Sequence, residues 1–188
     1  SLLVDPEGRV SGRYDKQHLV PFGEYVPLRR FLPFLEPLVE SVGNFSFGSS
    51  AAPLSMGTAR LGVLICYESI FPSLARQEAA AGANVLVNIT NDAWYGHSSA
   101  PYQSFAMAVL RAVETRRSLI RAANTGISGF VDPAGRILEK SPIFERLALA
   151  SAVPLLEKET IFMRFGHLFA PACLFLFPLL LFVRRRQK

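Results

Sequence analysis

Apolar and polar positions follow clear periods along most of the chain, and these periods predict strands that alternate with helices. Short apolar runs bounded by turn residues are typical of buried strands. The predicted strands are residues 61–65, 85–89, 119–123, 127–131 and 148–153. Helical periods occur at residues 73–81, closed by Gly82, and at residues 101–117, where Pro101 fits the first turn and the apolar side chains share one face.

Two turn sequences between short apolar segments predict β-hairpins. Asp-Pro-Glu-Gly lies inside residues 2–10, and Asp-Pro-Ala-Gly lies inside residues 131–137. Strands that alternate with helices, with hairpins at the edges, indicate a mixed α/β layered sheet. Residues 28–48 lack a clear period and are interpreted as an arm or short helix. This segment contains Phe31, Phe34, Phe45 and Phe47, which are expected either to form an exposed apolar interaction surface or to fill a core.

The C-terminal segment carries no charge from residue 168 to residue 183 and ends in a basic cluster. A helix over residues 165–183 would be about 28 Å long, close to the ~30 Å hydrocarbon core of a bilayer. We therefore predict a transmembrane helix, with a buried or surface-lying helix as the alternative. The basic cluster after the helix places the C-terminus in the cytoplasm and the body of the protein on the far side.

Composition adds three constraints to this picture. The 188 residues fit one domain, and half of them are hydrophobic. The net charge of +5 comes largely from the basic C-terminal cluster, so the body is nearly neutral and nucleic acid is not an expected partner. The three histidines show no metal-ligand spacing, and Cys66 and Cys173 lie in settings too different for a disulfide.

Cys66 ends the apolar run at residues 61–65 and opens a turn, which is where a nucleophile on a strand-to-helix elbow lies. Upstream, Lys16 and Glu24 stand eight residues apart. Together they suggest a Cys–Lys–Glu acyl-transfer site. Taken singly, the same residues read as a small core hydrophobe, a solvated lysine and a turn carboxylate. His18 is interpreted as a structural hydrogen-bonding residue.

Four segments together carry a specific resemblance. They are KQHLVPFGEYVP at residues 16–27, LICYE at 64–68, NITNDAWYG at 88–96 and ANTGISG at 123–129. In order and spacing they resemble the apolipoprotein N-acyltransferase family, bacterial membrane enzymes with a nitrilase-type (carbon–nitrogen hydrolase) catalytic domain.

The resemblance implies a nitrilase-like α-β-β-α sandwich, truncated on its N-terminal side. Residues 1–160 would be the C-terminal part of the catalytic domain, and residues 161–188 the transmembrane helix with a basic cytoplasmic tail. In the full-length protein the family implies several membrane spans in the bacterial inner membrane, with a periplasmic catalytic domain.

The resemblance also implies a reaction without cofactor or metal. Cys66 would take an acyl chain from a phospholipid, with phosphatidylethanolamine the expected donor, and pass it to the α-amino group of the diacylglyceryl-cysteine of an apolipoprotein. Lys16 would favour the thiolate and stabilise the oxyanion, assisted by the backbone N–H of Tyr67. Glu24 and Glu68 would hold Lys16, and Trp94 would contact an acyl chain.

The family's general base is a glutamate N-terminal to the Lys16 segment. Glu7 lies in a turn without the family's surrounding motif, so we expect the base to lie outside this chain and the chain alone to be inactive. Two alternatives stay open. One is a nitrilase-type amidase acting on small amides, and the other is a degenerate membrane-anchored binding module.

Overall fold

The computed structural model describes residues 1–25, 45–49 and 51–186. Most of the predicted Phe-rich arm, including Phe31 and Phe34, lies outside the described residues. Phe45 and Phe47 are described, and both side chains are exposed. The ring of Phe47 packs edge-to-face on Tyr25, with 5.5 Å between the ring centroids. Core filling is therefore wrong for these two phenylalanines.

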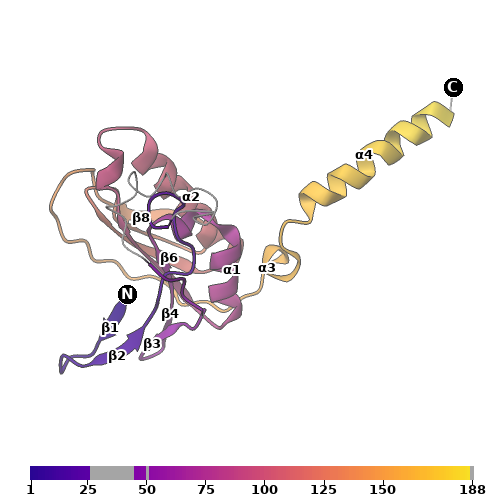
Figure 1. Ribbon diagram of the computed structural model, residues 1–188. Coiled ribbons are helices and arrows are strands. Elements are labelled where there is room, and N and C mark those ends of the chain that lie inside the picture. The colour runs from indigo at the N-terminus through magenta and orange to yellow at the C-terminus, as the bar shows by residue number, and fades with distance from the viewer. Residues whose placement is uncertain (26–44, 50, 187–188) are drawn as a thin grey trace.

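A six-stranded mixed sheet forms the centre of the molecule (Figure 1). Its three middle strands are parallel, and each outer strand is antiparallel to its neighbour. In spatial order the strands are β3 (Leu54–Met56), β4 (Ala59–Ile65), β5 (Val85–Asn91), β6 (Ser118–Asn124), β7 (Gly129–Val131) and β8 (Ile137–Lys140). A separate antiparallel hairpin is made of β1 (Leu2–Val4) and β2 (Val10–Arg13), as the turn sequence predicts.

Two helices connect the parallel strands and share the main core with one face of the sheet (Figure 1). Helix α1 (Pro72–Ala80) joins β4 to β5, and helix α2 (Ala100–Thr115) joins β5 to β6. Because side chains alternate along a strand, Leu64, Leu86 and Leu119 all point to this helical face and are fully buried there. Apolar burial of this kind is the main stabilising term of such a layer.

The opposite face of the sheet is covered only in part. A second small core joins Tyr14, Leu54 and Val63 beside the N-terminal hairpin. Further along, Ile89 of β5 points to this face and keeps 44% of its surface exposed. Of the four layers expected for the sandwich, the described part of the chain forms one helical layer on one six-stranded sheet.

One boundary and one element differ from the sequence predictions. The predicted helix at 101–117 ends at Thr115, because Arg116 adopts a left-handed backbone with φ of 52°. The predicted strand at 148–153 is wrong, since this segment pairs with no strand. The residues that follow it cross the starts of β5 and β6, where Leu156 N–H donates to the Asn84 carbonyl and Ser118 Oγ donates to the Pro154 carbonyl.

The C-terminal segment forms two helices, α3 (Ile161–Phe165) and α4 (Phe169–Arg186), and α4 points away from the sheet (Figure 1). The expected transmembrane helix over residues 165–183 is not supported. The helix is interrupted at Gly166, whose φ is 65°. Among the helices of the described residues, none is both long and apolar enough to cross a membrane. The 18 residues of α4 include three arginines, which leaves an uncharged part only about 22 Å long.

Candidate active site

Cys66 lies where β4 ends and a short 3₁₀ helix, η2 (Cys66–Ile70), begins. Its φ of 55° puts the residue in the left-handed region, which is uncommon for a residue other than glycine and is found mainly at sites where the surroundings hold it. The side chain is partly exposed and the thiol is free. This is the strand-to-helix elbow that the sequence predicts for a nucleophile.

Glu68, two residues after Cys66, is fully buried. Its carboxylate accepts hydrogen bonds from the Tyr14 hydroxyl at 3.1 Å and from the Ile65 N–H at 2.7 Å. It also accepts the backbone N–H groups of Gln17 at 2.6 Å and His18 at 2.9 Å. Four donors match the lone-pair capacity of a carboxylate, so an exposed surface salt bridge, the alternative reading of this residue, is wrong.

Lys16 and Glu24 form a close ion pair. The Lys16 Nζ atom lies 2.6 and 2.7 Å from the two carboxylate oxygens of Glu24, and only 11% of the lysine side chain is exposed. Glu24 in turn accepts the N–H of Val20 at 2.9 Å, so the segment folds back on itself. Glu24 thus contacts the ammonium directly, whereas Glu68 bonds to the backbone just after Lys16. Through Glu68, the Lys16 segment is docked on the turn that begins with Cys66.

Aromatic rings pack within and beside the short helix η2 that begins at Cys66. Tyr67 is partly exposed and packs edge-to-face on Phe71, with ring centroids 5.4 Å apart. The His18 ring packs on the same Phe71 at 4.0 Å. Trp94, on the short helix η3 (Ala93–Tyr95), is 86% exposed, so the indole is not a loop anchor packed on the core. Burial raises the pKa of the neighbouring Tyr95, and the negative charge of the Cys66 thiolate raises it further.

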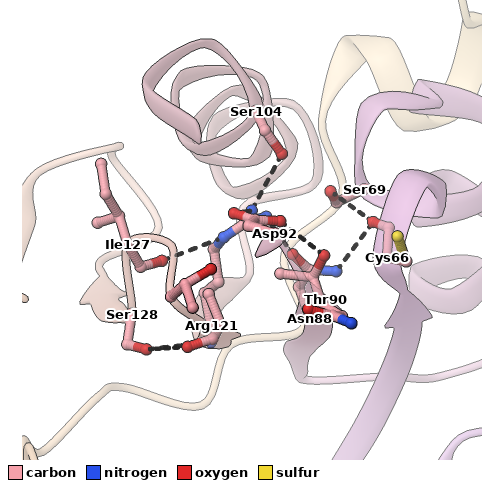
Figure 2. A network of polar contacts seen from close by, with 12 residues as sticks. Cys66, Ser69, Asn88, Thr90, Asp92, Ser104, Arg121, Ile127 and Ser128 are labelled. Atoms are coloured by element: carbon pink, nitrogen blue, oxygen red, sulfur yellow. Dashed lines mark hydrogen bonds and ion pairs between the residues drawn. The ribbon is translucent and has the colours of Figure 1, made fainter. Parts of the chain in front are cut away.

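A buried polar network lies beneath the elbow on the helical side of the sheet, and the sequence reasoning missed it (Figure 2). The Arg121 guanidinium forms an ion pair with Asp92 at 2.9 Å and donates to the side chain of Asn88. Arg121 also donates to Ser104 Oγ of α2 at 3.0 Å and to the Ile127 carbonyl at 3.2 Å. A Cβ atom at Gly126 would clash with the Asp92 carboxylate, so the loop passes close to the ion pair.

One signal of this network is present in the sequence. Asn88 and Arg121 each lie two residues after a buried leucine, Leu86 or Leu119, and so at inward positions of their strands. Asparagine is disfavoured in strand interiors. A buried polar group needs a hydrogen-bond partner. Two such residues on adjacent buried strands therefore indicate a shared polar contact.

A second carboxylate is buried close to Glu68. Glu78 of α1 is almost fully buried, and its Oε1 accepts a hydrogen bond from Gln17 Nε2 at 3.3 Å. Its Oε2 has no hydrogen-bond partner. Burial, and then the charge of Glu68, raises the pKa of Glu78 to about 7. Burial and the two nearby carboxylates also raise the pKa of Tyr14, which therefore stays a neutral hydrogen-bond donor to Glu68.

The raised pKa of Glu78 predicts a loss of stability as the pH rises. Between about pH 4.5 and 7 the folded protein keeps a proton that the unfolded chain has released, so the free energy of unfolding falls with pH through this window and levels off above it. The difference between the two pKa values corresponds to about 3 kcal/mol. Glu78→Gln cannot ionise, so we expect it to match the wild type near pH 5 and to unfold at a higher temperature at pH 8.

Thermal unfolding of both proteins at pH 5, 6.5 and 8 measures this difference. The exposed Glu145 provides the control, since Glu145→Gln should shift the unfolding temperature little and equally at each pH. A gap between wild type and Glu78→Gln that stays constant from pH 5 to pH 8 would show that Glu78 is ionised throughout.

Within residues 1–25, 45–49 and 51–186, no group of three or more His, Cys, Asp or Glu side chains is arranged to hold a metal ion. The chemical groups at the elbow are a thiol, an ammonium, buried carboxylates and backbone N–H groups. Such a set can form and break a covalent bond to an acyl carbon.

Comparison with known proteins found one family model and several named relatives that match the chain. Residues 1–155 match the family model described as carbon-nitrogen hydrolase. A relative from Geobacter metallireducens named apolipoprotein N-acyltransferase is 51% identical over 92% of this chain and 33% of its own length. One of the same name from Bdellovibrio bacteriovorus is 40% identical over 88% of this chain and 31% of its own length. The chain thus spans about a third of the length of these curated relatives.

Solved structures show a similar fold. An amidase from Nesterenkonia sp. AN1 matches with 28% identity and a TM-score of 0.53, over 76% of this chain and 52% of the amidase. In that structure acrylamide is added to the active-site cysteine. A carbon-nitrogen hydrolase from Helicobacter pylori matches with a TM-score of 0.55 at 18% identity, over 74% of this chain and 51% of its own.

Proposed function

Because this chain belongs to the carbon-nitrogen hydrolase family, we propose that it supplies the nucleophile and the oxyanion-stabilising groups of a lipoprotein N-acyltransferase. The acyl donor would be a membrane phospholipid and the acceptor the N-terminal amine of a lipoprotein. The contact that supports this most directly is the docking of the Lys16 segment on the Cys66 turn through Glu68. The names of relatives at 40–51% identity favour transfer to an amine over hydrolysis.

In the first half-reaction the Cys66 thiolate attacks the ester carbonyl of the phospholipid. A carbon–sulfur bond forms, the carbonyl oxygen becomes an oxyanion, and the carbon–oxygen bond to the glycerol then breaks. The lysophospholipid leaves as its alcohol after taking up a proton, and the acyl chain stays on Cys66 as a thioester. The proton that the thiol loses passes to a general base, which the family resemblance places N-terminal to Lys16.

In the second half-reaction the acceptor's α-amino group, in its neutral form, attacks the thioester carbon. A carbon–nitrogen bond forms, the carbon–sulfur bond breaks, and the amine loses a proton to the same base. The thiolate of Cys66 is restored and an amide is released. The diacylglyceryl-cysteine of an apolipoprotein is the acceptor implied by the family.

Lys16 and Tyr67 would act on the developing charge. The ammonium of Lys16 favours the thiolate and stabilises the oxyanion, while Glu24, at 2.6 and 2.7 Å, holds the ammonium in place. The Tyr67 N–H lies in the first turn of η2, where backbone N–H groups have no partner within the helix. The exposed indole of Trp94 offers an apolar surface to an acyl chain.

The site of action would be the membrane surface. The side chains of Ile161, Phe169 and Phe175, on α3 and α4, are each at least 80% exposed, and apolar groups of this size are stabilised by contact with lipid. In the bacterial inner membrane the catalytic part would face the periplasm, as the family implies. The exposed Phe45 and Phe47 would add to the same apolar contact.

A small-amide hydrolase is the second candidate, because the solved amidase with a modified active-site cysteine shares this fold. Mass spectrometry of the full-length protein separates the two. Brief incubation with phosphatidylethanolamine should add one acyl chain to the peptide containing Cys66, and hydroxylamine should remove it. Unmodified Cys66 with phospholipid, together with acylation of Cys66 by a small amide, would favour the hydrolase.

A further inference from the structure

The Cys66 carbonyl accepts hydrogen bonds from two side chains, one in η2 and one on the adjacent strand β5. Ser69 Oγ donates to it at 3.2 Å from within η2, and Asn88 Nδ2 donates to it at 3.4 Å from the adjacent strand β5 (Figure 2). Both Ser69 and Asn88 are fully buried. Two fixed donors therefore define the direction of a carbonyl whose residue has a left-handed backbone.

The direction of the Asn88 amide is set by its neighbours in the sheet. Asn88 lies between Leu64 of β4 and Arg121 of β6 in the parallel register. Arg121 can only donate hydrogen bonds, so the Asn88 side-chain oxygen must face the guanidinium. The amide nitrogen then faces the opposite strand, where it donates to the Leu64 carbonyl at 2.8 Å as well as to Cys66.

Arg121 is itself immobilised. Its side chain is fully buried and is held by Asp92 at 2.9 Å, by Ser104 Oγ at 3.0 Å and by the Ile127 carbonyl at 3.2 Å (Figure 2). Asp92 also accepts a hydrogen bond from Thr90 Oγ1 at 2.9 Å. Rotation of the Asn88 amide would break its contact with Arg121 and leave a buried cation facing the amide hydrogens.

Holding the Cys66 carbonyl also fixes the next N–H group. The Cys66 carbonyl and the Tyr67 N–H belong to one planar trans peptide and point in opposite directions. The side chains that hold the oxygen on the buried side therefore turn the Tyr67 N–H away from the network. An oxyanion donor must be aimed before the reaction begins, because reorienting it during the reaction would consume the stabilisation it provides.

We propose that Asn88 and Ser69 are positioning residues, which aim the Tyr67 N–H at the reacting carbonyl oxygen by holding the Cys66 carbonyl. The Arg121–Asp92 pair keeps the Asn88 amide in the orientation that this requires. This inference rests on the proposed role of Cys66 as nucleophile. It predicts a defect confined to steps that form an oxyanion.

The test compares two reactions of Cys66 in the full-length protein. Thioester formation with phosphatidylethanolamine develops an oxyanion, whereas alkylation by iodoacetamide forms a sulfur–carbon bond, expels iodide and develops none. Ser69→Ala removes one donor without changing charge. Asn88→Asp keeps the shape and the contact with Arg121 but replaces the donor nitrogen by an acceptor oxygen. Alkylation rates are measured at the high-pH plateau of each protein, where the thiol is fully ionised. Differences in the pKa of the thiol between variants then do not affect the comparison of rates.

Matched controls exist for both variants. Ser118 is fully buried like Ser69 and donates to the Pro154 carbonyl at 2.6 Å, at the far end of β6. Asn84 is buried like Asn88, and its Nδ2 donates to the Thr58 carbonyl at 2.9 Å, just before β5 begins. Ser118→Ala and Asn84→Asp thus remove equivalent hydrogen bonds away from the elbow.

We expect Ser69→Ala to slow thioester formation about 10-fold and Asn88→Asp to slow it about 10²-fold, the scale of one oxyanion donor. Alkylation should stay within about twofold of the wild type, and the controls should retain both rates. Equal losses in the two reactions, or wild-type thioester formation in Ser69→Ala, would overturn the inference. Acylation of a residue other than Cys66 would instead overturn the proposed function.

Discussion

Replacing Cys66 by alanine in the full-length protein is expected to abolish both lysophospholipid release and thioester formation. The thiolate is the only covalent carrier in the proposed reaction, and loss of a nucleophile typically lowers turnover by at least about 10⁴-fold. Release of lysophospholipid, measured by chromatography, and the mass of the acylated protein report the two effects separately. Alanine leaves the elbow's hydrogen bonds in place, since these use the backbone of residue 66.

Cys66→Ser is the matched control for shape. A serine hydroxyl fills nearly the same space and meets the same left-handed backbone, but it is a much poorer nucleophile near neutral pH. We expect it to be almost as inactive as the alanine variant. An acylated intermediate recovered on another residue of Cys66→Ala would contradict the assignment of Cys66.

Changing Lys16 is expected to give the second largest loss. Lys16→Ala removes the ammonium, and Lys16→Arg keeps a positive charge but presents a planar fork in place of the compact ammonium that Glu24 holds at 2.6 and 2.7 Å. Either change should lower the rate of thioester formation by at least about 10²-fold, as removal of one oxyanion-stabilising group does. Single-turnover measurement of thioester formation isolates this step.

The exposed Lys140 offers a control for the loss of a lysine as such. Lys140→Arg should leave single-turnover rates unchanged. Near-wild-type rates in Lys16→Arg or Lys16→Ala would show that Lys16 is a structural partner of Glu24 and not part of the chemistry.

The central strands and both covering helices were predictable from local pattern. Leu64, Leu86 and Leu119 each lie in an apolar run of sequence. These runs are apolar because the strands that they form are buried in the core. The pairing of one strand with another, by contrast, is not encoded in the local pattern of either strand. Residues 148–153 carry a strand-like pattern, yet they pair with no strand, because pairing requires that the fold brings another strand alongside and the local pattern does not encode this.

The site divides in the same way. Cys66 was predictable because the break between an apolar run and a turn is visible within a few residues. The Asn88–Arg121–Asp92 contacts were not predictable, because they depend on the register of β5 against β6. They also depend on the position of Asp92, directly after β5. The role of Glu68 was only half predicted. The family resemblance placed it beside Lys16, but only the fold shows that it bonds to the backbone after Lys16.

The left-handed backbone at Cys66 also affects how this position can change over time. Glycine adopts a φ near 55° without steric cost, whereas an L side chain there loses about 1 kcal/mol. Selection for a stable fold therefore favours glycine at residue 66, and selection for a nucleophile opposes it. A gene copy freed from its chemistry would gain stability by drifting to glycine here. In the reaction proposed above, a cysteine at this backbone angle is therefore a small loss of stability that accompanies the chemistry.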